Sequence, residues 1–160
     1  DGSYEWPQSN HGITIDHADN VWIGGNGQAD AHVSKFTRNG EFLMQIGSSG
    51  ARMTGMTSDG RSIYQGGSND TENFGRVAEI GFHADRNEMY LADGYLNKRV
   101  AVLDITTGAQ LAKLLPSDGS SFDYFGNSVA ISGDTARWPR TILARREELS
   151  IVHKRPLKRW

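Results

Sequence analysis

Five histidines are the side chains in this sequence best suited to metal binding or acid–base chemistry: His11, His17, His32, His83 and His153. A zinc site needs ligands that converge on one point, and none of the five forms a His-x-x-x-His or His-x-x-Glu pair. His17 and His83 fall in turn-like segments, so we expect both to be solvated. His32 begins an apolar run beside Asp30, where we expect a structural hydrogen bond.

The carboxylates stand mainly where turns begin. Five aspartates end apolar runs or start turns, where side chains accept backbone hydrogen bonds: Asp16, Asp70, Asp93, Asp104 and Asp134. Two interpretations stay open for Asp93, Asn97 and Arg99. Their side chains could contact a ligand in a channel of the fold. Alternatively, they form hydrogen bonds that join two neighbouring strands and the loop between them. The chain has no Gly-x-Ser-x-Gly elbow, Walker loop or Gly-x-Gly-x-x-Gly sequence, so serine-nucleophile chemistry and nucleotide binding lack a motif.

Short strands must position these residues, because the stretch 67–111, which contains Asp93, Asn97 and Arg99, has no helical period. Four apolar runs are expected strands: residues 12–16, 21–24, 32–37 and 41–46. Turn residues separate them, and Asn39-Gly40 favours the positive φ of a tight hairpin. The pattern predicts one four-stranded antiparallel sheet.

The same plan recurs in residues 67–111, at an offset of 67 to 68 residues. Its expected strands are residues 77–82, 88–92 and 99–104. The offset exceeds the roughly 40 to 50 residues of one propeller repeat. We therefore assign residues 48–66 to an insertion in which residues 61–65 are one further strand. Such a sheet cannot bury both faces alone, so the modules must pack radially or stack.

Three stretches resemble NHL repeats, the blades of six-bladed β-propellers. They are residues 11–25 (HGITIDHADNVWIGG), 35–47 (KFTRNGEFLMQIG) and 73–104. The resemblance covers residues 6–111 and implies an all-β fold, a partial β-propeller of four-stranded antiparallel blades in an incomplete ring. Residues 1–112 would then hold about two blades.

The second copy is the closer match to the NHL pattern. Phe74 stands where the repeat has its anchoring Phe, and Asp93 follows the second strand as in the family. Asn97 and Arg99 match the family's Asn/His-x-Arg motif. The copy departs from the pattern at Val77-Ala78, where a Pro commonly precedes the first strand.

A different pattern follows the second copy. Residues 114–136 resemble the start of an FG-GAP repeat, the blade unit of integrin-type seven-bladed propellers, through Phe125-Gly126 and the run 128–134. The Gly-Ala-Pro half of the motif does not follow. No Asp-x-Asp-x-Asp-Gly run is present, so calcium is not implied by this segment. We assign residues 113–136 to a partial FG-GAP-like blade.

Residues 137–160 differ from both families in composition. They include no glycine, where the glycine content of residues 1–136 predicts about three. Eight basic and two acidic residues give this segment a charge of +6, whereas nine basic and 17 acidic residues give residues 1–136 a charge of −8. Our hypothesis is an out-of-frame or artefactual basic tail. The alternatives are a short helix at 144–152 and a basic tail that binds an acidic surface.

Two classes of function fit these features. The first is a binding or scaffold module that recognises a protein, peptide or glycan on the loop-bearing rim of the propeller. Its candidate contacts are His11, Asn26, Asp93, Tyr95, Asn97 and Arg99. The second is a metal-dependent propeller enzyme similar to the peptide α-amidating lyase or the lactonases. Several channel-facing His, Asp or Glu side chains from different blades would favour the enzyme.

His11 is the metal-ligand candidate of the enzyme hypothesis. In the lyase family, His residues at blade starts bind a catalytic zinc, and His11 matches such a position. The second copy offers Ala78-Glu79 there. The simpler interpretation is that His11 forms a hydrogen bond with a neighbouring blade. No cofactor is evident, and a zinc or calcium site would need the full-length protein.

The acidic body argues against a nucleic-acid partner, because phosphate binding needs clustered Lys and Arg. No 18-residue apolar run and no signal peptide are visible, so no membrane span is expected. The sequence opens on Asp1 within a turn-rich segment. A removed signal peptide and additional modules before Asp1 therefore stay as alternatives.

The propeller resemblance implies a secreted or periplasmic location, and the absence of cysteine leaves the compartment open. Two or three blades cannot close a ring. We therefore expect self-association through open sheet edges.

Overall fold

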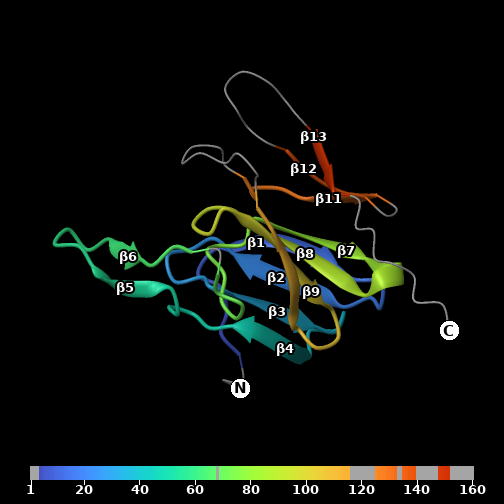
Figure 1. Ribbon diagram of the computed structural model, residues 1–160. Coiled ribbons are helices and arrows are strands. Elements are labelled where there is room, and N and C mark those ends of the chain that lie inside the picture. The colour runs from blue at the N-terminus through green and yellow to red at the C-terminus, as the bar shows by residue number, and fades with distance from the viewer. Residues whose placement is uncertain (1–3, 68, 116–124, 133–134, 140–147, 152–160) are drawn as a thin grey trace.

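The computed structural model describes residues 4–67, 69–115, 125–132, 135–139 and 148–151. In the first sheet the strands are antiparallel and lie side by side in chain order: β1 (Asn10–Ile15), β2 (Val21–Gly25), β3 (His32–Phe36) and β4 (Phe42–Gly47). Their β-branched and aromatic residues suit a pleated, half-buried surface. The four predicted strands agree with these bounds to within two residues (Figure 1).

The second sheet repeats the first strand for strand. It contains β7 (Glu79–His83), β8 (Glu88–Asp93), β9 (Arg99–Asp104) and β10 (Gln110–Leu114), again antiparallel. A single 3-10 turn, η1 (Ala84–Arg86), joins β7 to β8 and is followed by Asn87 with a left-handed φ of 54°. The internal repeat predicted from the 67-residue offset is therefore present.

The insertion between the two sheets forms a separate hairpin. Its strands β5 (Met53–Met56) and β6 (Ser62–Tyr64) pair with each other and project from the body (Figure 1). The strand predicted at residues 61–65 corresponds to β6. No sequence period indicated β5, because its two faces are both largely exposed and carry no apolar alternation.

A third sheet follows, with β11 (Ala130–Ser132), β12 (Thr135–Pro139) and β13 (Glu148–Ile151) in that order. The helix considered for residues 144–152 is wrong for the four residues of β13. These residues pair with β12 and are therefore extended. The remaining residues of that segment, 144–147 and 152, lie outside the described part of the chain.

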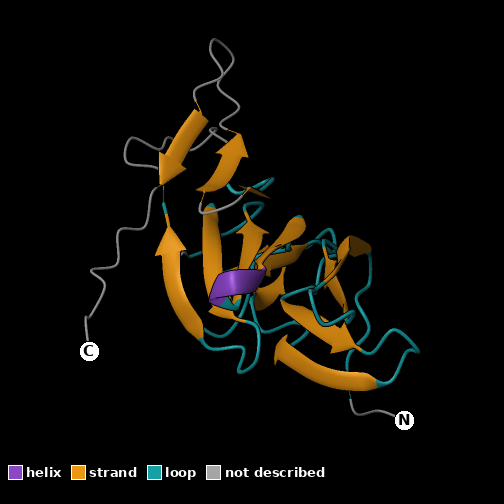
Figure 2. Ribbon diagram, turned by 90° about the vertical axis from the view of Figure 1, so that its right-hand side faces the viewer, coloured by secondary structure: helices purple, strands orange, loops and turns teal. Residues whose placement is uncertain are grey.

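The first two sheets pack face to face around one apolar core. On the first sheet Trp22 and Val33 are fully buried, and on the second sheet Met89, Leu91 and Leu103 oppose them. The first strands of the three sheets are neighbours, since β7 contacts both β1 and β11. This is the arrangement of propeller blades around an axis, and the described residues form part of such a fold without closing a ring. Figure 2 shows η1 (purple) as a single helical turn among the strands.

A second core lies on the other face of the second sheet. Tyr90, Val100 and Val102 are buried there against Phe125 and Val129, which precede β11. The aromatic residue of the Phe-Gly pair thus anchors the segment leading to the third sheet. The second sheet is apolar on both faces, as expected for a blade between two neighbours.

Two aromatic side chains meet between the first two sheets, since the ring centroids of Trp22 and Phe82 are 6.0 Å apart. Phe36 and Phe42 pair with each other on the other face of the first sheet. Phe36 pairs with Val21, one residue from Trp22, and therefore lies on the opposite face of the sheet. That face is covered by the N-terminal segment instead. Its aromatic contacts there are Tyr4–Phe36 and Tyr4–Phe42, both with ring centroids 5.0 Å apart, and Trp6–Phe36 at 5.9 Å.

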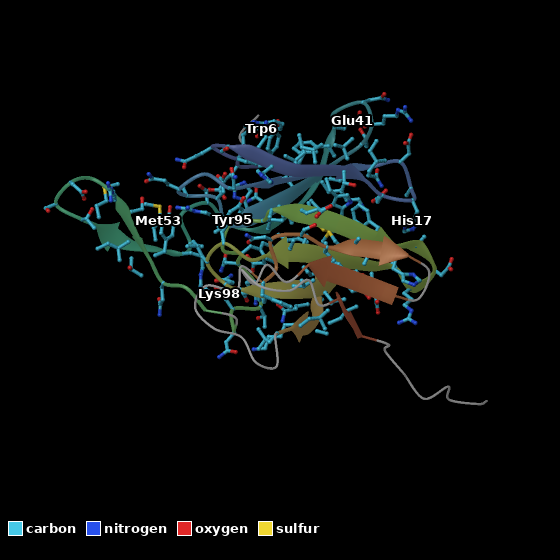
Figure 3. The ribbon with its side chains drawn as sticks, turned by 90° about the horizontal axis from the view of Figure 1, so that it is seen from above. Trp6, His17, Glu41, Met53, Tyr95 and Lys98 are labelled. Carbon is cyan, nitrogen blue, oxygen red and sulfur yellow. The ribbon has the colours of Figure 1, made fainter. Side chains whose placement is uncertain are left out.

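The connections between strands gather at two opposite ends of the sheets. We call one end the loop rim, defined by residues 8–11, 26–31, 75–78 and 94–98. The other, the turn rim, comprises residues 16–20, 37–41, 84–87 and 105–109. Figure 3 shows Tyr95 and Lys98 at the end from which the hairpin projects, and His17 and Glu41 at the opposite end.

The first turn is closed by Asp16, whose side chain is fully buried. Its carboxylate accepts hydrogen bonds from the backbone N–H groups of Ala18 and Asn20 and from the indole of Trp22, each at 2.9 Å. The Lys35 ammonium lies 3.4 Å away. Burial raises the pKa of Asp16, but the hydrogen bonds from Trp22 and Asn20 outweigh it and lower the pKa from 3.8 to about 2.

We expect Asp16 to make the stability of the fold depend on pH between about 4 and 2. A pKa that is lower in the folded than in the unfolded chain stabilises the fold above the unfolded value, and this contribution is lost as the pH falls through the folded value. Asp16→Asn should lower the free energy of unfolding by roughly 2 kcal/mol at neutral pH, and by progressively less toward pH 2. Urea denaturation at several pH values measures the difference.

The matched control is Asp59→Asn, since Asp59 is largely exposed in the hairpin. This control should leave the free energy of unfolding unchanged at neutral pH. An effect of Asp16→Asn that is as large at pH 2 as at neutral pH would contradict the assignment.

Candidate functional site

His11 stands at the loop rim, where β1 begins. Its Nδ1 lies 2.6 Å from the backbone carbonyl oxygen of Ala78 in the second sheet. A carbonyl can only accept, so Nδ1 carries the proton and donates it. The imidazole also meets the ring of Tyr95 edge-on, with centroids 6.3 Å apart. The hydrogen bond to a neighbouring blade, the simpler interpretation of His11, is therefore confirmed.

Asn26 and Tyr95 are the other predicted contacts that reach the surface of the loop rim. Asn26 follows β2, and its backbone N–H donates to the carbonyl of Ser9 at 3.0 Å. Tyr95 lies in the loop between β8 and β9, and 44% of its surface is exposed. The structure thus brings His11, from the start of β1, and Asn26 and Tyr95, from two separate loops, to one end of the molecule.

Asp93, Asn97 and Arg99 form a buried network. Asp93 and Arg99 have no exposed surface, and Asn97 has 4%. The Arg99 Nε lies 2.7 Å from the Asp93 carboxylate, which also accepts hydrogen bonds from the Asn97 amide at 2.8 Å and the Gly75 N–H at 2.6 Å. These three residues therefore offer no surface to a rim ligand, and their contacts match the structural interpretation.

The network continues into the segment between the hairpin and β7. The Arg99 guanidinium donates to the carbonyl of Asn73 at 3.1 Å and also bonds the carbonyl of Asp70. The Asp70 carboxylate in turn pairs with Arg52 at 2.7 Å. Burial raises the pKa of Asp93, while the charge of Arg99 opposes that rise. These contacts tie the inserted hairpin to the second sheet.

Of the other described histidines, His32 and His83 are buried and His17 is exposed. His32 is fully buried, and its Nε2 lies 2.9 Å from the carbonyl of Glu5, so the expected structural hydrogen bond is present. His17 is exposed as expected. The expectation for His83 is wrong, since only 8% of its surface is exposed. The reason is that β7 extends through His83, which pairs with Glu88 on β8.

The hairpin brings two further residues to the loop rim. Ser62 donates a hydrogen bond to Gln28 at 2.9 Å, which places the hairpin beside the loop after β2. The Arg76 guanidinium lies over the ring of Tyr64, 4.5 Å from its centroid. The sequence contained no signal for this pair, because Tyr64 and Arg76 meet only once the hairpin folds back on the segment leading to β7.

A groove of about 550 Å³ lies between the outer strand β4 and the turn after β9. The side chains of Met44 and Ile46 face the turn, and Ile46 lies within 3 Å of the position that a Cβ on Gly108 would take. None of the predicted site residues lines it. The lining residues are Met44, Gln45, Ile46, Gly47, Thr71, Glu72, Thr107, Gly108, Ala109 and Gln110.

Within the described ranges, no three His, Cys, Asp or Glu side chains gather where they could hold a metal ion. Glu79, the residue at the equivalent blade start, accepts hydrogen bonds from the Ser128 hydroxyl at 2.5 Å and the Val129 N–H at 3.0 Å.

The Phe-Gly pair joins the third segment to the second sheet through a close backbone contact. Phe125 is buried, with 1% of its surface exposed, and Gly126 has a positive φ of 82°. A Cβ on Gly126 would lie 2.3 Å from the carbonyl oxygen of Arg99. Glycine is therefore required here both by the backbone conformation and by the lack of space.

We expect Gly126→Ala to destabilise the fold by about 2 kcal/mol more than Gly60→Ala. Gly60 is the matched control because its φ is 81° and nothing lies within 4 Å of the added Cβ. The control measures backbone strain alone, whereas Gly126→Ala must also displace the backbone of Arg99. Urea denaturation of both variants measures the difference, and equal losses would contradict the close contact.

An FG-GAP repeat model matches residues 109–136 of the chain. The match includes β10, the last strand of the second sheet, as well as Phe125-Gly126 and β11. It begins five residues before the segment that we predicted from Phe125-Gly126. The family pattern therefore includes the outer strand of one blade and the inner strand of the next.

A comparison with curated proteins finds no match. In the described part of the chain, no helix has the length and apolar character to cross a membrane. The chain thus carries an FG-GAP-like segment, residues 109–136, joined to two four-stranded antiparallel sheets of a partial propeller-like fold.

Proposed function

We propose that this chain is part of an extracytoplasmic β-propeller, with two NHL-like blades and one FG-GAP-like blade. We propose that it acts as a binding or scaffold module for a protein, peptide or glycan. The observation that carries the proposal is the convergence of His11, Asn26 and Tyr95 on one rim. Loops held by a rigid sheet scaffold are the usual place for recognition residues.

The FG-GAP match supports both the propeller setting and the extracytoplasmic location, since these repeats are typical of extracellular proteins. The hairpin β5–β6 supports the choice of rim, because it extends the loop rim on one side (Figure 1). For the metal-dependent enzyme, His11 is the candidate ligand, and no group of three His, Cys, Asp or Glu side chains that could hold a metal is found among the described residues.

The outer face of the first sheet supports self-association. Ile13 and Ile15 on β1 are 60% and 53% exposed. Their repeat equivalents, Ile80 and Phe82, pack against the first sheet in the inter-blade core. The positions that join the first two blades are therefore exposed on β1, beside the part of this face that Tyr4 and Trp6 cover, and we propose that a second copy of the chain packs there.

We expect Ile15→Lys to shift the chain toward a monomer in sedimentation velocity runs at increasing concentration. The matched control is Ile63→Lys, because Ile63 is an equally exposed isoleucine of the hairpin, 45% exposed. A concentration-independent monomer for the unchanged chain, or the same shift for both variants, would contradict the use of this face.

Glycan and peptide arrays test the rim-binding proposal. We expect the chain to bind members of one of these classes, and Tyr95→Ala to weaken that binding at least tenfold. The control is His17→Ala, an exposed aromatic side chain on the turn rim (Figure 3). Binding that is lost in His17→Ala and kept in Tyr95→Ala, or no binding to either array, would contradict the proposal.

A further inference from the structure

Arg76 has a backbone conformation that an arginine rarely adopts. It lies in the segment between the hairpin and β7, and its φ is 70°, in the left-handed region. Glycine occupies this region freely, whereas a side chain with a Cβ is strained there. Strain of this kind is concentrated at functional sites, so the position calls for a role of the side chain.

The side chain of Arg76 is oriented but left without a polar partner. Its guanidinium is held over the ring of Tyr64 at 4.5 Å, a cation–π contact that fixes its direction. Among the described residues it forms no hydrogen bond or ion pair, and its Nε is buried without a partner. The hydroxyl of Tyr64 is likewise buried and unpartnered.

The neighbouring arginines differ in this respect. Arg52 pairs with Asp70 and Arg99 with Asp93, each at 2.7 Å. The nearby carboxylates of the network are thus already paired, and Arg76 is left as a cation at the surface of an acidic body. Buried polar atoms without partners in a native fold call for a water, an ion or a ligand group.

Arg76 lies within the loop rim. The carbonyl of the preceding residue, Gly75, accepts the N–H of Leu96 at 3.1 Å, and the carbonyl of Ala78 contacts His11 at 2.6 Å. The arginine therefore stands between the loop that carries Tyr95 and the start of β1. Figure 3 shows Tyr95 at the end of the molecule where the hairpin projects.

The geometry points to Arg76 and Tyr64 as a carboxylate-binding subsite of the loop rim. A guanidinium presents a planar fork of N–H donors that matches a carboxylate, and the hydroxyl of Tyr64 adds one more donor. Two sources share this chemistry, the acidic residues of a peptide and the uronic acids of a glycan. The inference rests on the proposed rim-binding function and names the charged group that the rim recognises.

Titration calorimetry with the full chain tests the subsite. The probes are hexaglutamate and an oligogalacturonate, each compared with its neutral counterpart, hexaglutamine and an oligogalactose. We expect one acidic probe to bind at least tenfold more tightly than its neutral counterpart, which also identifies the source of the carboxylate. We expect Arg76→Gln to remove this preference. Arg38→Gln, which removes an arginine of the turn rim, should keep it.

Two further variants separate binding from folding. Arg76→Gly relieves the backbone strain, so it should unfold at the same or a higher denaturant concentration while losing the preference for acidic probes. Tyr64→Phe keeps the aromatic ring and should weaken the acidic probe several-fold. Loss of stability in Arg76→Gly would show that the arginine is structural and would overturn the subsite.

The outcomes also distinguish this inference from the proposed function. Binding on the arrays that depends on Tyr95 but not on Arg76 would overturn the carboxylate subsite and leave rim binding intact. Equal affinity for acidic and neutral probes would do the same. A chain that binds no array member but prefers the acidic probes through Arg76 would keep the subsite and contradict recognition through Tyr95.

Discussion

Replacing Trp22 with alanine should lower the free energy of unfolding by about 3–5 kcal/mol, one of the two largest effects that we expect. Trp22 is fully buried between the first two sheets and packs against Phe82. Its indole N–H also donates to Asp16 at 2.9 Å, and Lys35 lies over its ring. The substitution therefore opens a cavity in the inter-blade core and removes a donor from a buried carboxylate. Urea denaturation measures the loss.

Trp6→Ala is the matched control for this prediction. Trp6 is 53% exposed and contacts the rings of Tyr4 and Phe36 at the outer face of the first sheet. Its removal should cost less than about 1 kcal/mol. Similar losses for the two tryptophans would mean that the inter-blade core does not hold the first two sheets together.

Asp93→Ala should also cost about 3–5 kcal/mol, because it leaves the fully buried Arg99 without its carboxylate. The Asn97 amide and the Gly75 N–H lose their acceptor at the same time. Since these contacts join β8, its loop and the segment before β7, we expect the loss to appear as cooperative unfolding of the second sheet. Denaturant titration followed by tryptophan fluorescence and circular dichroism measures it.

The control is Arg38→Ala, which removes the partner of Asp19 in an exposed ion pair with an N–O distance of 2.8 Å. We expect no measurable change there, because solvent screens that pair. The double variant Asp93→Ala with Arg99→Leu should recover part of the loss, since the unpaired buried charge is gone. An Asp93→Ala chain as stable as the unchanged one would refute the structural role of the network.

Local sequence chemistry predicted seven of the eight strands of the two sheets, and β10 (Gln110–Leu114) was the one that it missed. Alternating apolar residues and turn residues such as Asn39-Gly40 act over a few positions, so they can be recognised without knowledge of the fold. The repeat at 67 residues likewise needed only the order of these elements. The short strand β5 was missed because no apolar alternation marks it.

The candidate site was predictable only in part. The position of His11 before an inner strand suggested a hydrogen bond to a neighbouring blade, and Ala78 supplies the acceptor. The sequence did not reveal that Tyr95 is exposed and Asp93 is buried, because both residues lie near the end of β8. The difference depends on the tertiary structure, in which Asp93 accepts a hydrogen bond from the N–H of Gly75, 18 residues away in the sequence.

What the sequence by itself determined is therefore the set of short antiparallel strands, their repetition and the Phe-Gly start of the FG-GAP-like segment. Only the tertiary structure decided which face of each strand meets which neighbour. It placed Trp22 between the sheets and Phe36 under the N-terminal segment, and it brought Arg76 over Tyr64. The physical reason is that side-chain alternation defines two faces for a strand, whereas long-range packing selects the partner of each face.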